Sequence, residues 1–241
     1  MAMRICITND DGIHSEGLLR LVQWANKLGE VYVFAPKVEQ SAKSHAVEIH
    51  KAFEVKQAEV SGAVKAYAVD STPADCVRFA VLGLHEQFDL VISGVNRGLN
   101  IGQDIMYSGT CSAAMEAVGL GIKALALSTE PETFDDAFAH LDRVWAFIEE
   151  NKLYEKSRLW NVNIPHSTTG EIHITRQGGP YFSDDFHPQE NDMYLPCGKD
   201  VFAPTSGCDF DTDCVLRKRC ISITPLTIDR TDMTAYQAMK R

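Results

Sequence analysis

Long hydrophobic runs are absent from the sequence. None of its stretches approaches the ~20 consecutive apolar residues that a helix needs to cross a bilayer. The N-terminal residues begin a strand-like segment directly, without an apolar, signal-like stretch. We therefore expect a cytoplasmic protein that has no membrane partner.

Positive charge is also scarce. The 241 residues include 23 Lys and Arg against 33 Asp and Glu, which gives a formal net charge of −10. A nucleic-acid backbone is bound by concentrated Lys and Arg, so we expect no nucleic-acid partner. If an acidic chain of this kind handles phosphate, a metal ion or a helix N-terminus has to supply the positive charge.

Paired-cysteine motifs are missing as well. The seven cysteines are odd in number, include no CxxC, and place Cys6 inside an apolar strand-like run. A disulfide framework is therefore not expected, and reduced thiols are typical of a cytosolic protein. The spacings between Cys197 and Cys220 do not suit a zinc knuckle, so they give a zinc site only weak support.

Short apolar runs alternate with helical patterns along the chain. Strands are predicted at residues 3–8, 31–35, 66–69, 89–93, 124–128, 159–164, 172–175 and 220–224. Helices are predicted at residues 18–28, 73–84, 110–120 and 135–150. Strands that alternate with helices at this spacing imply right-handed crossovers. The predicted fold class is therefore α/β, with a parallel sheet that carries helices on both faces.

Two segments depart from this alternation. Residues 178–215 are rich in Gly, Pro, Asp and aromatic residues and show no clear periodicity. A structureless stretch of that length is unusual inside a compact domain, so we interpret it as an extended arm or a functional loop. Residues 45–62 are predicted to form a β-hairpin that is inserted into the first half.

Three strand ends carry groups of polar residues. These groups are Asn9, Asp10, Asp11 and Gly12; then Glu39, Gln40 and Ser41; then Gly94, Asn96, Gly98 and Asn100. Ligands of an open parallel sheet bind outside the carboxyl ends of its strands, so these loops are expected to converge. Their carboxylate, hydroxyl and carboxamide oxygens suit a hard cation such as Mg²⁺ or Mn²⁺.

Asp10 and Asp11 taken alone have two interpretations. They can form a polar turn that caps the next helix, or they can hold the cation. Adjacent like charges at a strand end resist joint ionisation unless a cation is present. The convergence of three polar loops favours the metal site.

Ser108, Gly109 and Thr110 begin a helix whose first turns are built from small residues. Free backbone N–H groups and two hydroxyls at a helix N-terminus form a phosphate site, although Ser and Thr are also ordinary helix caps. Four charged or imidazole side chains are weaker candidates for contact with an anionic substrate, and each is equally explained as a surface residue: His14, Lys37, His45 and Arg97.

Taken together, these residues resemble the SurE family, stationary-phase survival proteins that act as metal-dependent 5′/3′-nucleotidases. The blocks that carry the resemblance run through nearly the whole chain: ITNDDGIHSEGL (7–18), APKVEQSAKSHA (35–46), STPADCV (71–77), SGVNRGLNIGQDIMYSGTCSAAMEA (93–117) and DTDCVLRKRCISITPL (211–226). The combination of NDDG, EQSA, SGVNRGLN and YSGT in this order is specific, and no single motif among them is.

The resemblance implies a particular site and architecture. Its metal ligands are Asp10, Asp11, Ser41 and Asn96, and its phosphate or substrate contacts are Asn9, Asn100, Ser108, Gly109 and Thr110. A Rossmann-like α/β catalytic core is expected over residues 1–177. Residues 178–241 are expected to form a β-rich arm, a final strand and a helix that join subunits into a homodimer or homotetramer.

The implied activity is hydrolysis of nucleoside 5′- and 3′-monophosphates, with short polyphosphate as a further substrate to consider. In the predicted reaction, water activated by the cation at Asp10 and Asp11 attacks phosphorus. Asn96, Asn100 and the helix at Thr110 stabilise the charge on the phosphoryl oxygens.

Two other functions are compatible with parts of the pattern. A receiver-type regulatory module also binds Mg²⁺ at paired acids, but its phosphoacceptor Asp has no counterpart in the SGVN that ends the comparable strand. A dinucleotide-dependent oxidoreductase needs a GxGxxG motif after its first strand, and none stands there.

Overall fold

The computed structural model of the chain describes residues 2–240. Its strands are β1 Met3–Thr8, β2 Gly29–Pro36, β3 Val55–Ala58, β4 Lys65–Val69, β5 Leu90–Arg97, β6 Lys123–Thr129, β7 Leu159–Ile164, β8 Ile172–Ile174, β9 Phe182–Pro188, β10 Tyr194–Asp200 and β11 Ile221–Pro225. Its α-helices are α1 Glu16–Ala25, α2 Pro73–Arg78, α3 Gly109–Gly119, α4 Asp135–Glu150, α5 Leu153–Lys156 and α6 Met233–Met239. Shorter helical turns are η1 Phe79–Gly83, η2 Gly102–Met106 and η3 Asp213–Arg217.

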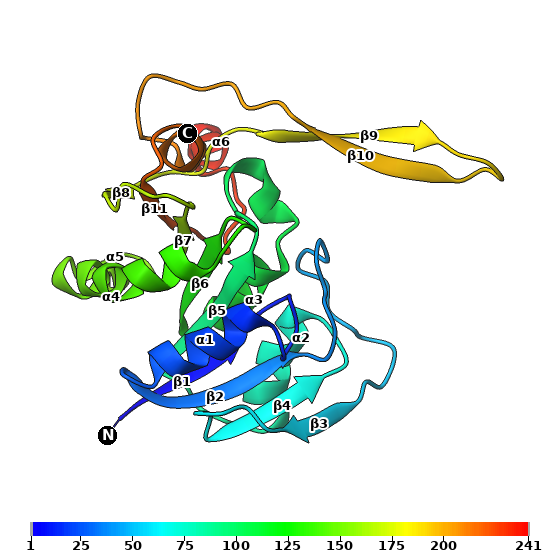
Figure 1. The fold of residues 1–241 in the computed structure, drawn as a ribbon, viewed down its shortest axis with the longest axis vertical. Helices are drawn as coiled ribbons and strands as arrows, with labels where there is room; N and C mark the ends of the chain where they lie inside the picture. The colour runs from blue at the N-terminus through cyan, green and yellow to red at the C-terminus, as the bar shows by residue number, and fades with distance from the viewer. Residues whose placement is uncertain (1, 241) are drawn as a thin grey trace.

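Nine strands form one sheet in the order β3-β4-β2-β1-β5-β6-β7-β11-β8 (Figure 1). The six central strands from β4 to β7 are parallel to their neighbours. The antiparallel pairs are β3 with β4 and β11 with β7. The predicted α/β fold with a mostly parallel sheet is therefore confirmed, and antiparallel pairs occur only toward its two edges.

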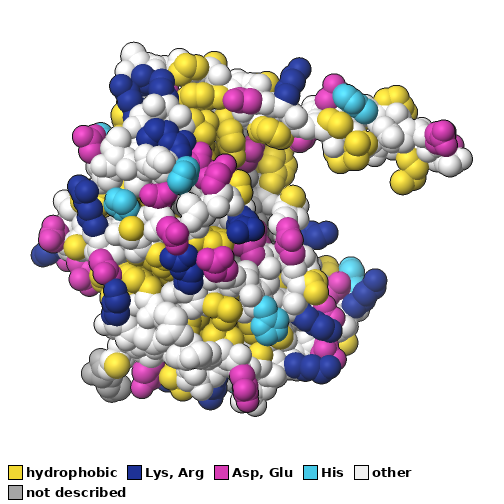
Figure 2. All heavy atoms as spheres, viewed as in Figure 1, with side chains coloured by type: hydrophobic (Ala, Val, Ile, Leu, Met, Phe, Trp, Pro, Cys, Tyr) yellow, Lys and Arg dark blue, Asp and Glu magenta, His cyan; other side chains and the backbone are white. Residues whose placement is uncertain are grey.

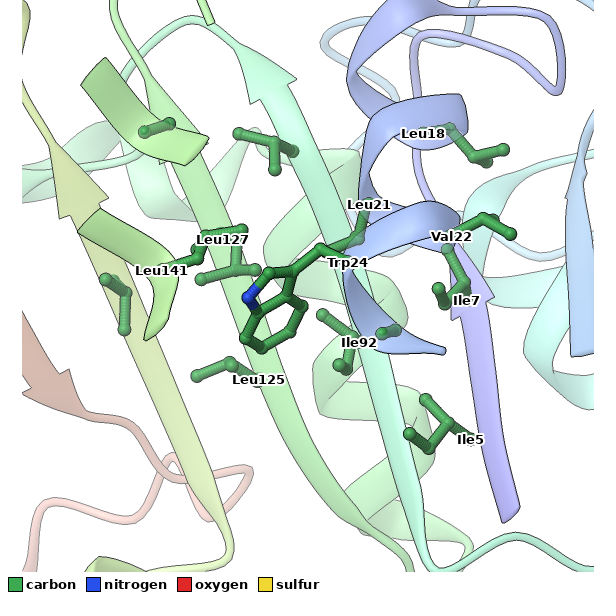
Figure 3. Packing of buried hydrophobic residues seen from close by; sticks show 14 of the residues in the cluster. Ile5, Ile7, Leu18, Leu21, Val22, Trp24, Ile92, Leu125, Leu127 and Leu141 are labelled. Carbon is green, nitrogen blue, oxygen red and sulfur yellow. The ribbon is translucent and has the colours of Figure 1, made fainter. Parts of the chain in front are cut away.

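Helices cover both faces of this sheet, because side chains alternate across each strand. Ile5 and Ile7 of β1 belong to a core cluster that also includes buried residues of α1 and α4, such as Leu21 and Leu141. Cys6, between them, belongs to a second cluster with residues of α2 and α3. Figure 3 shows the first cluster, in which aliphatic side chains of α1 and of the central strands pack together.

The ends of several elements differ from the prediction. The helix predicted at 18–28 is α1, which begins earlier because the Ser15 hydroxyl caps it by accepting from the backbone N–H of Leu18 at 3.4 Å. Helix α1 ends at Ala25. The backbone N–H groups of Lys27 and Leu28 donate to the backbone oxygens three residues earlier, those of Trp24 and Ala25, and these bonds close the last turn. β5 continues past Ser93 to Arg97, with an irregularity in register between Ser93 and Asn96.

The hairpin predicted at residues 45–62 is wrong in its position. The structure forms an antiparallel hairpin from β3 and β4, in which Val55 pairs with Val69 and Ala58 with Ala66. Its connection passes Gly62, whose φ of +91° favours glycine. Residues 45–54 form no strand; Ile49, for example, is 74% exposed and has no sheet face on which to pack.

The irregular stretch from residue 178 contains an antiparallel hairpin, β9 and β10, which we call the hairpin arm. It projects from the body of the molecule, and hydrophobic side chains lie along it (Figures 1 and 2). Phe186, Tyr194 and Leu195 are 62%, 63% and 54% exposed. The chain then returns to the main sheet as β11, and the domain boundary at residue 177 stays a prediction.

Within residues 2–240, no helix combines the length and apolar character needed to cross a membrane.

Candidate active site

The three polar loops meet at the carboxyl ends of β1, β2 and β5. β1 and β5 are adjacent parallel strands with Thr8 paired to Ser93, so the chain leaves both at the same edge. The loop after β2 is attached to the same place because the backbone N–H of Gln40 donates to the backbone oxygen of Asp10 at 2.8 Å. The convergence expected from the strand order is therefore present.

Asp10 lies where this edge meets the start of α3. Asp10 is only 4% exposed to solvent, and one of its carboxylate oxygens accepts a hydrogen bond from the hydroxyl of Thr110. Gly109 makes this approach possible: a Cβ added there would lie 2.8 Å from the Cβ of Asp10 and 3.1 Å from the Cγ of Pro73. The helix N-terminus and its partial positive charge are thus held against Asp10.

Negative charge is crowded around these two carboxylates. Burial raises the pKa of Asp10, while hydrogen bonds from Thr110 act against that shift. The pKa of Asp11 is raised to about 6 by burial and then by the charges of Asp10 and Glu39, despite a hydrogen bond from the backbone N–H of Arg97 at 3.2 Å. A divalent cation would relieve this repulsion, so the charge balance fits a metal site.

Ser41 and Asn96 carry neutral oxygens and line the same cavity as Asp10. The Ser41 hydroxyl donates to a carboxylate oxygen of Glu39 at 2.6 Å, which leaves its own oxygen lone pairs available. The Asn96 side-chain amide donates to the backbone oxygen of Gly98 at 2.8 Å. Among residues 2–240, no group donates to the Asn96 side-chain oxygen, which is the atom a hard cation would use.

Asn100 is held rigidly at the same edge. Its side-chain amide donates to the Ser128 hydroxyl at 2.8 Å, and its backbone N–H donates to the side-chain oxygen of Asn163, also at 2.8 Å. Its backbone oxygen accepts from the amides of Asn161 and Asn163. Sequence reasoning missed both asparagines of β7, although two amides at alternate positions of an otherwise apolar strand are a recognisable signal.

Ser108 caps α3. Its hydroxyl accepts from the backbone N–H of Cys111 at 3.0 Å, and the helix continues through buried Thr110 and Ser112. The first backbone N–H groups of α3 therefore start beside Asp10, at the place where a phosphate bound at a helix N-terminus would lie.

A cavity of about 650 Å³ opens over this edge. Five of the predicted site residues line it: Asp10, Ser41, Asn96, Asn100 and Ser108. Asp11, Gly109 and Thr110 are not part of this lining, but Gly109 and Thr110 contact Asp10 and the Asp11 carboxylate accepts from the backbone N–H of Arg97. Asn9 also does not line the cavity; its side-chain amide donates to the backbone oxygen of Gly12 and to the Ser15 hydroxyl, so it shapes the loop that carries Asp10.

Apart from Ala42 and Arg97, the rest of the lining comes from two segments that sequence reasoning did not assign to the site. One is the turn before α3, with Gln103, Asp104 and Tyr107; the other is the root of the hairpin arm, with Pro180, Phe182, Ser183 and Asp184. The Gly-Gly-Pro break followed by two aromatic residues at 178–182 is the one local signal for the second segment. Its position over the cavity depends on long-range packing.

The structure distinguishes among the four weaker candidates for contact with an anionic substrate. Lys37 forms ion pairs with Glu54 and Asp70 at 3.1 and 3.7 Å, and neither His14 nor His45 lines the cavity. Of the described residues that do line it, Arg97 alone is a Lys or Arg. Arg97 is therefore the side chain available to meet an anionic substrate.

Comparisons with known proteins find similar sequences and a similar structure. The family model described as "Survival protein SurE" matches residues 5–184. A protein of Desulforudis audaxviator named 5′-nucleotidase SurE is 39% identical over 251 residues, covering 99% of this chain and 97% of that protein. One of the same name from Thermococcus gammatolerans is 36% identical over 255 residues, covering 99% and 95%. The crystal structure of the SurE protein from Aquifex aeolicus superposes with a TM-score of 0.77 at 29% identity and covers 98% of each chain.

Proposed function

The chain belongs to the SurE family, and we infer from this membership that it is a 5′-nucleotidase, a phosphoric monoester hydrolase. It hydrolyses nucleoside monophosphates to a nucleoside and phosphate. The receiver-type alternative is not favoured, because relatives named 5′-nucleotidase match nearly the whole chain. Beyond this, we propose that nucleoside 3′-monophosphates and short polyphosphate are also substrates.

The cation that this chemistry requires would be held by Asp10, Asp11, Ser41 and Asn96. Two carboxylates, a hydroxyl and a carboxamide form an all-oxygen donor set, which suits Mg²⁺ or Mn²⁺. The raised pKa values of Asp10 and Asp11 support the same assignment, because their charges lack compensation within the chain. A bound divalent cation supplies Lewis-acid chemistry: it offsets charge on phosphoryl oxygens and makes water a better nucleophile.

The side chains and backbone of the site would bind and orient the phosphate. The N-terminus of α3, from Ser108 to Thr110, directs backbone N–H groups and its dipole toward the negative charge. Asn100 is positioned by four hydrogen bonds that would not have to reorganise during the reaction. Arg97, whose guanidinium lies over the Phe134 ring, would add a positive charge at the cavity wall.

The aromatic and arm residues would bind the nucleoside. Tyr107 and Phe182 both line the cavity, from the turn before α3 and from the arm root respectively. Aromatic faces accept any base by stacking, so these residues would favour nucleotides over smaller phosphate esters without strict base selection. Arm residues over the cavity would also exclude bulk water.

The observation that carries this proposal is the contact of buried Asp10, which lines the cavity, with Thr110 and Gly109. It brings the proposed metal carboxylate next to the proposed phosphate-binding helix end. The test is phosphate release from a panel of nucleoside 5′- and 3′-monophosphates. Release should stop with EDTA and return when Mg²⁺ or Mn²⁺ is added in excess. No release with any divalent metal would contradict the proposal.

We also propose that the chain works as a homodimer or homotetramer in the cytoplasm. The hairpin arm presents Phe186, Tyr194 and Leu195 to solvent, and exposed apolar surface of this kind is typical of a contact between subunits. Free cysteines, none of them in a disulfide, are consistent with a reducing compartment. Molar mass from light scattering tests the assembly; a monomer at assay concentrations would refute it.

A further inference from the structure

A second group of metal-ligating side chains lies away from the cavity, at the β8 edge of the sheet. Glu171 and His173 flank Ile172 of β8, so both side chains point to the same face of the strand. β11 pairs parallel to β8 with Ile221 opposite Ile172, which places Cys220 beside Glu171. The carboxylate, imidazole and thiol atoms all lie within 4.8 Å of one another.

Two of the three distances between these atoms are close to those between ligands around one zinc-type cation, and the third is within 4.8 Å. His173 Nε2 lies 3.5 Å from Glu171 Oε2, and the Cys220 sulfur lies 3.8 Å from the same oxygen. Zinc bonds of about 2.0–2.3 Å in a tetrahedron require ligand atoms roughly 3.3–3.7 Å apart. Only small side-chain adjustments are therefore needed to bring the three atoms onto one ion.

Local hydrogen bonds already engage part of the group: the Cys220 thiol lies 3.4 Å from the backbone oxygen of Lys218 and 3.8 Å from Glu171 Oε2. Among residues 2–240, Glu171 forms no ion pair with a Lys or Arg; its ion-pair partner is His173. Cys220 is almost completely buried, at 3% exposure, yet its sulfur faces this exposed carboxylate and accepts from the Thr169 hydroxyl at 3.4 Å. A thiol, an imidazole and a carboxylate that converge at a strand edge form a soft-to-borderline donor set.

This group differs from the catalytic site in both place and chemistry. The order β5-β6-β7-β11-β8 puts four strand spacings between Asn96 on β5 and His173 on β8, or about 19 Å at ~4.8 Å per spacing. The catalytic donors are all oxygens, whereas Cys220 provides sulfur. One metal ion cannot serve both groups, and the two should select different metals.

We propose that Glu171, His173 and Cys220 bind Zn²⁺, with water in the fourth position. Binding displaces the thiol proton of Cys220 to solvent and fixes β8 to β11 by a bond between side chains. β8 is three residues long and leads directly into the root of the hairpin arm. Zinc therefore stabilises the edge of the sheet from which the arm, and with it part of the cavity lining, is positioned.

Cobalt titration of the metal-free full-length protein tests this site. Co²⁺ bound to a thiolate gives a charge-transfer absorption band that cobalt on oxygen ligands alone does not give. The band should saturate at one Co²⁺ per chain and disappear when Zn²⁺ is added. It should be lost in Cys220→Ser, and His173→Gln, a change at a partly exposed side chain, should weaken cobalt binding by at least about 10-fold.

Two control variants test whether the thiolate absorption band arises at the proposed zinc site. Asp10→Asn should retain it, because that carboxylate belongs to the other site. Cys197→Ser should also retain it. Cys197 is paired with Asp185 on the hairpin arm, and Asp185 lies 3.8 Å from His187, but these three residues do not converge as the Cys220 group does. No thiolate band in the wild type, or a band that survives Cys220→Ser and is lost in Cys197→Ser, would overturn the proposal.

Discussion

The substitution Gly109→Ala tests the contact on which the proposed catalytic site depends. Gly109 is the first residue of α3, and a methyl group added there would lie 2.8 Å from the Cβ of Asp10 and 3.0 Å from its carboxylate oxygen. Contacts under 3.0 Å have to be relieved by movement. Asp10 or the first turn of α3 must then shift by several tenths of an ångström.

Two opposing effects set the change in stability. Replacing a helical glycine with alanine gains about 0.5–1 kcal/mol, whereas overpacking a dense site costs about 1–3 kcal/mol. The expected net loss is about 1 kcal/mol, equivalent to a fall of about 2–4 °C in the melting temperature of a chain of this size. Activity should respond more strongly, because a displacement of 1 Å at a reacting centre can cost about 100-fold.

We therefore expect kcat/KM for nucleoside monophosphates to fall about 10-fold or more, with a higher Mn²⁺ concentration needed for half-maximal activity. Gly119→Ala is the matched control, because it lies in the same helix and an added Cβ there would meet no atom within 4 Å. That variant should keep wild-type kinetics. If Gly109→Ala had the same kinetics and the same metal requirement as Gly119→Ala, the close contact between α3 and Asp10 would be refuted.

Three further predictions follow from the site and the arm. Asp10→Asn should keep the fold, seen by circular dichroism, and lose activity by about 100-fold or more; near-wild-type turnover would remove Asp10 from the mechanism. In metal-free protein the pKa of Asp11 is raised to about 6, above its ordinary value of 3.8, so its carboxylate favours the folded state when protonated. The contribution of Asp11 to folding stability is full below about pH 3.8 and is lost as the pH rises through 6. In EDTA, the melting temperature of the wild type should therefore rise relative to that of Asp11→Asn as the pH falls from 7 to 5. Parallel plots of melting temperature against pH for the two proteins would contradict the raised pKa. Replacing both Phe186 and Leu195 with Ser should reduce the molar mass measured by light scattering, whereas an unchanged oligomer would exclude the hairpin arm from the interface.

Much of the fold follows from local patterns in the sequence. Alternating apolar runs and helical periodicities predicted the central strands and α4 closely, because burial on both sheet faces leaves a local signal at each position. The rule for strand ends also predicted that Asp10, Ser41 and Asn96 lie at one edge of the sheet, and all three line the same cavity. These inferences need only the direction of each strand and its order along the chain.

Contacts between distant segments needed the tertiary structure. The approach of Gly109 to Asp10, and the hold of Asn161 and Asn163 on Asn100, depend on how helices and strands pack at a given register. The hairpin at 55–69 was predicted at the wrong position. Apolar and polar residues alternate in residues 45–50 as they do in a strand, but no sheet lies there for the apolar side chains to pack on.

The sequence by itself therefore determined the α/β class, the strand-end residues of the candidate site and the resemblance to a nucleotidase family. Only the tertiary structure decided that the arm root lines the cavity, and that Glu171 and Cys220, 49 residues apart, stand side by side. Side-chain periodicity reports which face of an element is buried. It carries no information on which distant element covers that face, and that choice is made by packing over the whole chain.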